Sequence, residues 1–333
     1  MKKIKVAQIG LNLNSHSVQI FNSITKQKDI FEVVGYVLPE NEKTRIKNKL
    51  YVVDGYKELT IDEVLNNPEI EAVIIETDEI FLTKYALMAA RAGKHIHMEK
   101  PGGLNPASFE ELISIIKNTG KVFHTGYMYR YNPYVIELMK KIKNDELGEI
   151  ISVEAQMNCI LPSSTRQWLE ALPGGMMFYL GCHLVDLVLQ IKGQPDKIIP
   201  LNKSSGVDGV TSKDFGMAVF EYENGISFVK TAACEIGGYA RRQLVVSGTK
   251  GTVELKPFEM FDDSETHYTV KTEYNSEIWN DMGKNSKSEK FDRYDNMMKS
   301  FAEYVRGEKS NPYTPDFELE LYKTILKACG QNL

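Results

Sequence analysis

Cysteine is scarce in this sequence, with four residues in 333. Cys159, Cys182, Cys234 and Cys329 form no C-x-x-C pair and show no spacing typical of metal ligands. The sequence therefore predicts no metal site. Four isolated thiols are typical of a reducing compartment, so we expect a cytoplasmic protein without structural disulfides.

Long apolar runs are also missing. No stretch of about 18 apolar residues is present, which excludes a conventional membrane-spanning helix. The first residues, Met1 to Lys5, lead directly into a strand pattern without the apolar core of a secretory signal. The sequence therefore predicts no membrane partner.

An excess of positive charge is absent as well. The chain carries 40 basic and 45 acidic residues, a net charge of −5, which argues against nucleic acid as a partner. The one basic stretch, from Lys43 to Lys49, directly follows Glu40 and Glu42, and this mixture indicates a solvated helix face.

The first 125 residues alternate between apolar strand patterns and amphipathic helix patterns. Near-continuous apolar strands separated by helices indicate a parallel sheet covered on both faces. The sequence therefore predicts a doubly wound Rossmann-type α/β domain over residues 1–125. The expected strands are 4–10, 31–38, 72–77, 95–98 and 121–125, and the expected helices are 15–26, 61–66, 80–92 and 106–118.

The pattern changes near residue 150, where longer strands of alternating character begin. Together with turn signals between the strands, this predicts an α+β domain over 126–333, built on a mainly antiparallel open sheet. The polar segment 262–290 is expected to be a surface loop, and the last two helices are candidates for packing back on the first domain. The expected strands are 149–158, 215–222, 225–233, 241–247 and 251–256, and the expected helices are 132–145, 175–192, 291–306 and 315–329.

The first strand ends in a turn that resembles a dinucleotide-binding fingerprint. Of the three glycines in G-x-G-x-x-G only Gly10 is present, with Asn12 and Ser15 at the other two positions. Asparagine tolerates positive φ better than most residues, and a serine is small enough to let a helix approach and to cap it. The free N–H groups of the following helix predict an anion site, although an ordinary turn is an equal alternative.

The acid that usually binds the ribose of the dinucleotide is not at its expected place. Leu38 stands at the end of the second strand, and Glu40 follows two residues later. Either Glu40 reaches the ribose from the loop, or no acid is used and Glu40 is simply solvated.

The segment Gly93–Pro101 combines a helix stop, a short strand and the triplet Glu99-Lys100-Pro101. This places Lys100 at the carboxyl edge of the parallel sheet, where ligands bind in such folds. A lysine there can act as a general acid or base. Because a pairing with Glu99 would hold the proton on Lys100, we expect Glu99 to point elsewhere.

Several ordered segments are similar to the Gfo/Idh/MocA oxidoreductase family. They include its strand–helix–Glu-Lys-Pro block, its Arg-x-Asn-Pro segment, its link into the second domain, its glycine-rich helix ending in histidine, and a sheet turn. In this chain they are residues 72–101, 130–133, 147–153, 174–183 and 248–252.

The resemblance implies an NAD(P)-dependent enzyme that transfers hydride to or from a sugar, sugar derivative or cyclitol. It implies that Lys100 is the catalytic acid or base and that His183 assists, whereas Tyr179 replaces a family aspartate. The implied cofactor-binding residues are Gly10, Asn12, Asn14, Ser15, Leu38, Glu76, Thr77 and Glu99. The expected substrate-binding residues are Lys100, Tyr127, Arg130, Asn132, Trp168, Tyr179 and His183.

Each of these residues has a structural alternative. Lys100 as a surface lysine, His183 as a core histidine and Asn132 as a turn residue before Pro133 are all compatible with the sequence. Two other functions also stay open, namely a non-catalytic ligand sensor and a glycosidase-type enzyme that uses NAD without net redox. The family resemblance further implies a homo-oligomer formed through the C-terminal sheet.

Overall fold

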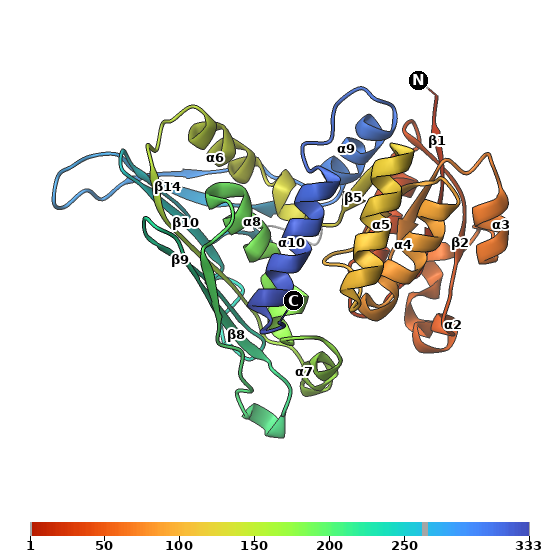
Figure 1. Ribbon diagram of the computed structural model, residues 1–333, viewed down its shortest axis with the longest axis horizontal. Coiled ribbons are helices and arrows are strands. Elements are labelled where there is room, and N and C mark those ends of the chain that lie inside the picture. Colours follow the sequence, from red (N-terminus) through yellow and green to blue (C-terminus); the bar gives the residue numbers. More distant parts are fainter. Residues whose placement is uncertain (1, 262–265, 333) are drawn as a thin grey trace. The chain divides into compact units, whose positions relative to one another are not determined.

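The computed structural model describes residues 2–261 and 266–332 and divides into two compact units. The N-terminal unit comprises the chain up to Tyr127 together with Tyr294–Tyr322, and the C-terminal unit comprises Met128–Arg293 and the residues from Lys323 onward. The return of a late segment to the first unit means that each unit is built from two stretches of the chain (Figure 1).

The N-terminal unit contains a five-stranded sheet in the order β2-β1-β3-β4-β5, and every neighbouring pair is parallel. The strand order reverses at β1, which lies between β2 and β3. In doubly wound sheets the ligand crevice lies outside the carboxyl ends of the strands at this point. The strands are β1 (Ile4–Ile9), β2 (Phe31–Val37), β3 (Ala72–Ile75), β4 (His95–Met98) and β5 (Phe123–Thr125).

The helices of this unit begin and end at residues suited to those positions. Asn105 caps α5 by accepting the N–H of Ser108, Pro106 follows at the first helical position, and Gly120 ends the helix in the left-handed conformation. Thr60 and Glu63 form a capping box at the start of α3. The helices are α1 (Ser17–Lys26), α2 (Glu42–Arg45), α3 (Ile61–Asn66), α4 (Leu82–Arg91), α5 (Pro106–Thr119) and α9 (Asp295–Val305).

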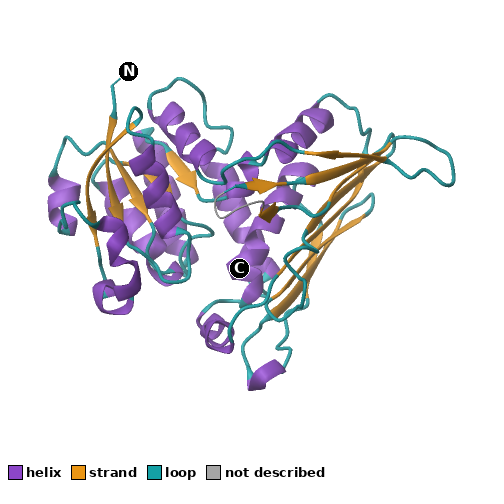
Figure 2. Cartoon of the chain, turned by 180° about the vertical axis from the view of Figure 1, so that it is seen from behind, coloured by secondary structure: helices purple, strands orange, loops and turns teal. Residues whose placement is uncertain are grey.

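The C-terminal unit contains an eight-stranded sheet in the order β15-β14-β11-β10-β6-β9-β8-β7 (Figure 2). All of its neighbouring pairs are antiparallel except β6 with β9. A two-stranded sheet pairs β12 with β13. The strands are β6 (Ile150–Asn158), β7 (Lys197–Pro200), β8 (Phe215–Glu221), β9 (Ile226–Ala232), β10 (Gln243–Gly248), β11 (Thr252–Leu255), β12 (Met260–Phe261), β13 (His267–Tyr268), β14 (Val270–Tyr274) and β15 (Lys284–Lys287).

The helix α8 packs on this sheet and contacts β6. A single π turn, Met177–Gly181, leads into it. The remaining helices are α6 (Pro133–Lys143), α7 (Ser163–Trp168) and α8 (Cys182–Lys192), and α10 (Pro315–Ala328) crosses the boundary between the two units at Tyr322.

The predicted fold class is confirmed, since a parallel Rossmann-type sheet precedes a mostly antiparallel one. The expectation that 262–290 is a loop is wrong for the described part, where β13, β14 and β15 form; residues 262–265 lie outside the described residues. These strands are mainly polar, so hydrogen-bonded pairing decides their structure and hydrophobic periodicity does not: β13 pairs with β12, β14 with β11, and β15 with β14. Among the described residues, no helix has the length and apolar character that a membrane crossing requires.

Candidate active site

The turn between β1 and α1 depends on Gly10, which has a φ of +97°. A Cβ at this position would lie 2.6 Å from the backbone nitrogen of Thr77 and 2.7 Å from the carbonyl of Glu76. Only glycine permits both the conformation and this close approach of the ends of β1 and β3. The first residue of the fingerprint therefore has the structural role that a dinucleotide-binding turn requires.

Asn12 replaces the second glycine by turning its side chain inward. Its Nδ2 donates to the carbonyl of Thr77 and to Oε2 of Glu79, and its Oδ1 accepts the N–H of Asn14. The residue is fully buried, and its φ is not positive, so the tolerance for positive φ that we invoked for it is not used. The side chain is thereby kept beneath the turn instead of on its outer surface.

Ser15 links the turn to the following helix and to β3. Its Oγ accepts the N–H of Ser17, the first residue of α1, and donates to Oε2 of Glu76. Lys49 adds a positive charge at the same turn, since its Nζ donates to the carbonyls of Asn12 and Leu13. The first turn of α1 contains no acidic residue. A helix N-terminus of this kind, with a lysine beside it, fits the pyrophosphate of a dinucleotide.

Four buried carboxyl groups surround this turn, namely Glu42, Glu76, Glu79 and Glu99. Burial raises the pKa of Glu42 and of Glu99 to about 7, and it also raises the pKa values of Glu76 and Glu79. The positive charge of Lys100 partly opposes this increase in pKa for Glu76, Glu79 and Glu99. We call these four side chains the carboxyl cluster, and near neutral pH it holds protons that exposed carboxylates would have lost.

Lys100 is a buried residue at the carboxyl edge of the sheet, only 3% exposed. Its Nζ lies 3.5 Å from Oε1 of Glu99. The expectation that Glu99 points away is therefore wrong. The physical reason is space, because Gly126 offers no side chain, and a Cβ there would lie 2.8 Å from Oε2 of Glu99. The pairing favours the protonated form of Lys100.

A buried acid that the sequence analysis did not single out contacts this turn. Leu38 is half-buried, and Glu40 accepts from Nζ of Lys84 and the hydroxyl of Tyr85. Glu42, the first residue of α2, instead accepts the N–H of Leu11 at 2.8 Å with its Oε2. No sequence motif marks Glu42, because a short helix four residues beyond the expected position brings it back to the turn.

A pair of buried histidines extends the cluster into the sheet. His97 and His124 are neighbours in the β4–β5 register, and their Nδ1 atoms lie 2.7 Å apart. Nε2 of His97 lies 3.8 Å from Oε1 of Glu76. Burial lowers the pKa of His97 to about 3, so this ring is neutral at physiological pH. The sequence analysis did not single out either histidine.

Three of the residues predicted for substrate chemistry, Trp168, Tyr179 and His183, lie at or near the π turn. The rings of Tyr179 and Trp168 meet edge to face with centroids 5.5 Å apart, and both side chains are half-buried. His183, one helical turn further, is buried and lies edge to face with Tyr129 at 5.2 Å. π turns are frequent at functional sites because they re-aim side chains within a helix.

Three other predicted substrate residues lie inside the protein. Arg130 donates both Nε and Nη2 to Asp186 in a fully buried ion pair. Asn132 caps α6 through the N–H groups of Tyr134 and Val135, and its amide donates to Thr269. Tyr127 belongs to the N-terminal unit and is 1% exposed. Their predicted contacts with substrate stay predictions.

The C-terminal unit has its own buried acid, which the sequence did not reveal. Glu259 accepts from Nη1 of Arg242 at 2.6 Å and from Nε of Arg293 at 2.7 Å, and it also contacts the hydroxyl of Tyr129. The two arginines overcome the effect of burial and lower its pKa to about 2.

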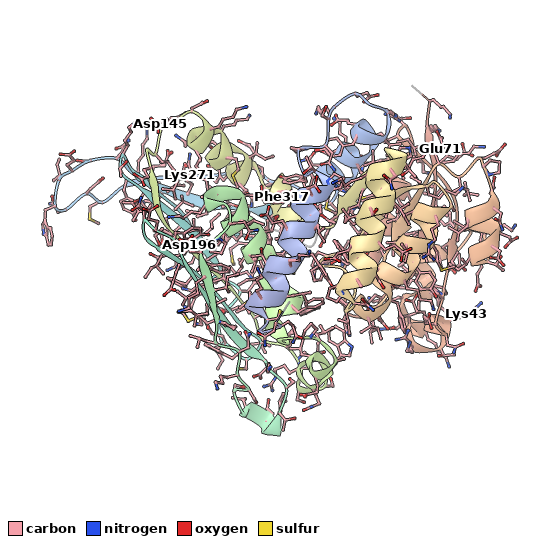
Figure 3. All side chains as sticks on the ribbon, in the orientation of Figure 1. Lys43, Glu71, Asp145, Asp196, Lys271 and Phe317 are labelled. Atoms are coloured by element: carbon pink, nitrogen blue, oxygen red, sulfur yellow. The ribbon has the colours of Figure 1, made fainter. Side chains whose placement is uncertain are left out.

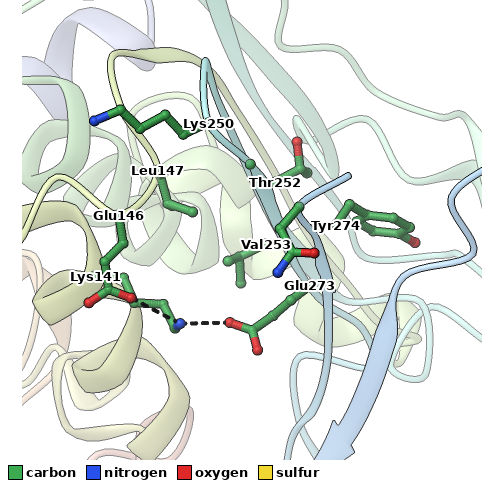
Figure 4. A pocket seen from close by; sticks show the side chains of 10 residues that line it. Lys141, Glu146, Leu147, Lys250, Thr252, Val253, Glu273 and Tyr274 are labelled. Carbon is green, nitrogen blue, oxygen red and sulfur yellow. Dashed lines mark hydrogen bonds and ion pairs between the residues drawn. The ribbon is translucent and has the colours of Figure 1, made fainter. Parts of the chain in front are cut away.

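A surface pocket of about 110 Å³ in the C-terminal unit lies apart from these groups (Figure 4). Lys141 bridges Glu146 and Glu273 at its rim. Pockets for small molecules usually enclose roughly 300–1,000 Å³, so this one does not compete as an active site. Within the described ranges, no group of three or more His, Cys, Asp or Glu side chains is suited to a metal ion.

Comparison with known proteins agrees with this geometry. Residues 4–127 match the model of the oxidoreductase family with an NAD-binding Rossmann fold, and residues 135–254 match the GFO/IDH/MocA C-terminal domain. The chain belongs to the Gfo/Idh/MocA oxidoreductase family. The matched NAD-binding region contains the Gly10 turn, the carboxyl cluster and Lys100, so NAD or NADP is the cofactor of this family member.

Individual relatives of this Gfo/Idh/MocA member are distant. The uncharacterized oxidoreductase YhhX of Escherichia coli is 31% identical over 139 residues, which are 41% of this chain and 40% of that protein. The scyllo-inositol 2-dehydrogenase (NADP⁺) IolW of Bacillus subtilis is 24% identical over 164 residues, covering 49% and 46%. The matched segments thus span less than half the length of these two relatives.

A solved structure supports the fold over the whole chain. It is that of a protein assigned as an NADPH-dependent oxidoreductase from Desulfitobacterium hafniense, with a TM-score of 0.79 and 21% identity. The match covers 99% of this chain and 95% of that one.

Proposed function

We propose that this protein is an NAD(P)-dependent oxidoreductase that transfers hydride between the nicotinamide and a CH–OH group of a cyclitol, sugar or sugar derivative. The observation that carries the proposal is Lys100, buried at the carboxyl edge of the parallel sheet beside the Gly10 turn and paired with Glu99. The scyllo-inositol dehydrogenase of B. subtilis supports the substrate class.

The chain's own residues supply proton transfer and positioning. When bound, the nicotinamide supplies the hydride acceptor or donor. In its neutral form Lys100 accepts the hydroxyl proton during oxidation, and in its protonated form, which the pairing with Glu99 favours, it donates a proton to the carbonyl oxygen during reduction. Glu99 stabilises the charged form of Lys100, and its own pKa of about 7 lets it share the proton near neutral pH.

The C-terminal unit is proposed to recognise the substrate. Tyr179 and Trp168 present an aromatic corner, and aromatic faces suit the apolar side of a sugar or cyclitol ring. His183 is proposed to hold the reacting oxygen, and Tyr179 to donate a hydrogen bond in place of the family's aspartate. We further propose a homo-oligomer formed through the C-terminal sheet, which sedimentation velocity would detect as a species heavier than one chain.

The proposal is tested by a substrate screen with cyclitols and aldoses that monitors reduction of NAD⁺ and NADP⁺. Lys100→Met is expected to lower kcat by about 10²–10⁴-fold while cofactor binding stays within about threefold, because general acid–base catalysis contributes that much to rate. Lys100→Arg is the matched control, since it keeps the charge but does not release a proton at neutral pH. Equal rates for wild type and Lys100→Met would refute the assigned role.

A non-catalytic ligand sensor is the second candidate, and the carboxyl cluster favours it because unpaired acids oppose a phosphate-bearing cofactor. A sensor would bind polyols without any reduction of NAD⁺ or NADP⁺, and Lys100→Met would leave that binding intact. The same screen therefore separates the two candidates.

A further inference from the structure

Glu42 occupies a place at the cofactor turn that its sequence position does not predict. Its Oε2 accepts the N–H of Leu11, the residue that directly follows Gly10, at 2.8 Å. The carboxyl group therefore lies against the turn that follows β1, although Glu42 itself belongs to the segment that follows β2. In doubly wound folds this region receives the adenosine ribose of the dinucleotide.

The second carboxyl oxygen of Glu42 lacks a hydrogen-bond donor within the described chain. Its Oε1 is buried and has no hydrogen-bond partner within the described chain, and the residue is 1% exposed. A buried acceptor without a donor is energetically unfavourable. A ribose hydroxyl would supply the donor that the protein does not.

The other acids of the same loop are already engaged. Glu40 accepts from Lys84 and Tyr85, and Asp78 pairs with Arg45. Lys43, on the outside of the N-terminal unit, pairs with Glu58 (Figure 3). Arg45 and Lys84, the basic side chains that a 2′-phosphate would need here, are thus neutralised, whereas the charge of Glu42 has no ion-pair partner among the described residues.

We infer that Glu42 is the residue that selects NAD(H) over NADP(H) in this protein. Its carboxylate accepts a ribose hydroxyl and repels a phosphate at the same carbon. This inference rests on the proposed function, because it assumes that a dinucleotide binds at the Gly10 turn. The inference concerns only which dinucleotide is preferred. A protein that binds both dinucleotides without preference would therefore refute the inference, whereas a protein that binds neither would refute the proposed function.

The test is isothermal titration of the full-length protein with NAD⁺ and NADP⁺ at about pH 8, where the carboxyl is ionised. Wild type is expected to bind NAD⁺ at least about tenfold more tightly than NADP⁺. Glu42→Gln keeps an oxygen that accepts the Leu11 N–H but loses the charge. This variant is expected to lower the preference to less than about threefold, mainly by tighter binding of NADP⁺.

Glu40→Gln is the matched control, because it removes an acid from the same loop that is already neutralised. It is expected to leave the ratio of the two dissociation constants within about twofold of wild type. Equal or tighter binding of NADP⁺ to wild type would overturn the inference, even if no variant folded. A larger change in Glu40→Gln than in Glu42→Gln would do the same. Failure of wild type to bind either dinucleotide would instead refute the proposed function.

Discussion

Two groups of buried glutamates in this protein show opposite protonation behaviour. The carboxyl cluster of the N-terminal unit has raised pKa values, to about 7 for Glu42 and Glu99. Glu259 of the C-terminal unit is equally buried, yet its pKa falls to about 2. The difference lies in the partners, since Glu259 pairs with two arginines, whereas Glu76, Glu79 and Glu99 share the single charge of Lys100.

The comparison separates a structural acid from a set of functional candidates. Glu259 accepts hydrogen bonds from Arg242, which directly precedes β10, and from Arg293, two residues before α9, so neither of its oxygens is without a donor. All four members of the carboxyl cluster, Glu42, Glu76, Glu79 and Glu99, each keep one oxygen without a hydrogen bond among the described residues. Perturbed groups of the second kind, placed at a ligand crevice, are typical of functional sites.

The largest effect is expected from Glu259→Gln. The substitution leaves two buried guanidinium groups without their counter-charge, which typically costs about 3–5 kcal/mol. Hydrogen-exchange mass spectrometry should show faster exchange in β10 and β11, whereas peptides from β1 and β3 stay unchanged. Normal protection of β10 in this variant would show that the network is not what stabilises the unit.

The pH dependence of stability should also differ between the units. Folded Glu42 and Glu99 bind more protons than their unfolded forms, whose pKa is 4.5, so they make the N-terminal unit less stable as pH rises through about 7. Below pH 6.5 the lowered pKa values of His95 and His97 act in the opposite direction. Glu259 contributes stability above pH 4.5, which is lost as pH falls toward about 2.

Local exchange rates between about pH 6.5 and 8, corrected for the intrinsic chemistry, provide the measurement. The opening free energy of β1 and β3 should decrease over this range, on the order of 1–3 kcal/mol, and that of β10 should not. Parallel changes in both units would contradict the assigned pKa shifts.

Glu76→Gln is expected to have the smallest effect and the opposite sign to Glu259→Gln. It replaces a carboxyl whose ionisation is opposed by burial with a neutral amide, so the N-terminal unit should gain about 1–2 kcal/mol at pH 8 relative to wild type. Slower exchange in β1 and β3 is the expected result. Equal destabilisation by Glu76→Gln and Glu259→Gln would contradict the proposed difference between the carboxyl cluster and Glu259.

The sequence predicted the parallel architecture because β1 and β3 at its centre are short apolar runs between helices, IKVAQI and AVII. It also placed Lys100 and the Gly10 turn at one edge, since motif and strand end coincide. It could not predict the contact of Glu42 with Leu11, which spans 31 positions, or that of Glu259 with Tyr129, which spans 130. Such contacts depend on tertiary packing and leave no local periodicity.

The strand β14 was missed for a related reason. Its segment, VKTEY, is polar, and Lys271 in it is buried only because Glu137 and Glu273 pair with its ammonium group. The sequence pattern reflects only the polar character of these residues, whereas backbone hydrogen bonds to β11 stabilise β14 as a strand. The inward turn of Asn12 was equally hidden, because its partners Thr77 and Glu79 lie more than 60 residues away.

The most direct test of this account is calorimetric titration of NADH at pH 7 in two buffers of different ionisation enthalpy. If the carboxyl cluster underlies the cofactor site, the added negative charge raises its pKa values, and binding should take up between about 0.3 and 1 proton per NADH. Glu259→Gln should leave this number unchanged if the variant remains folded. Micromolar binding with proton uptake is the predicted result, and binding without proton uptake, or no binding by the folded protein, would contradict the account.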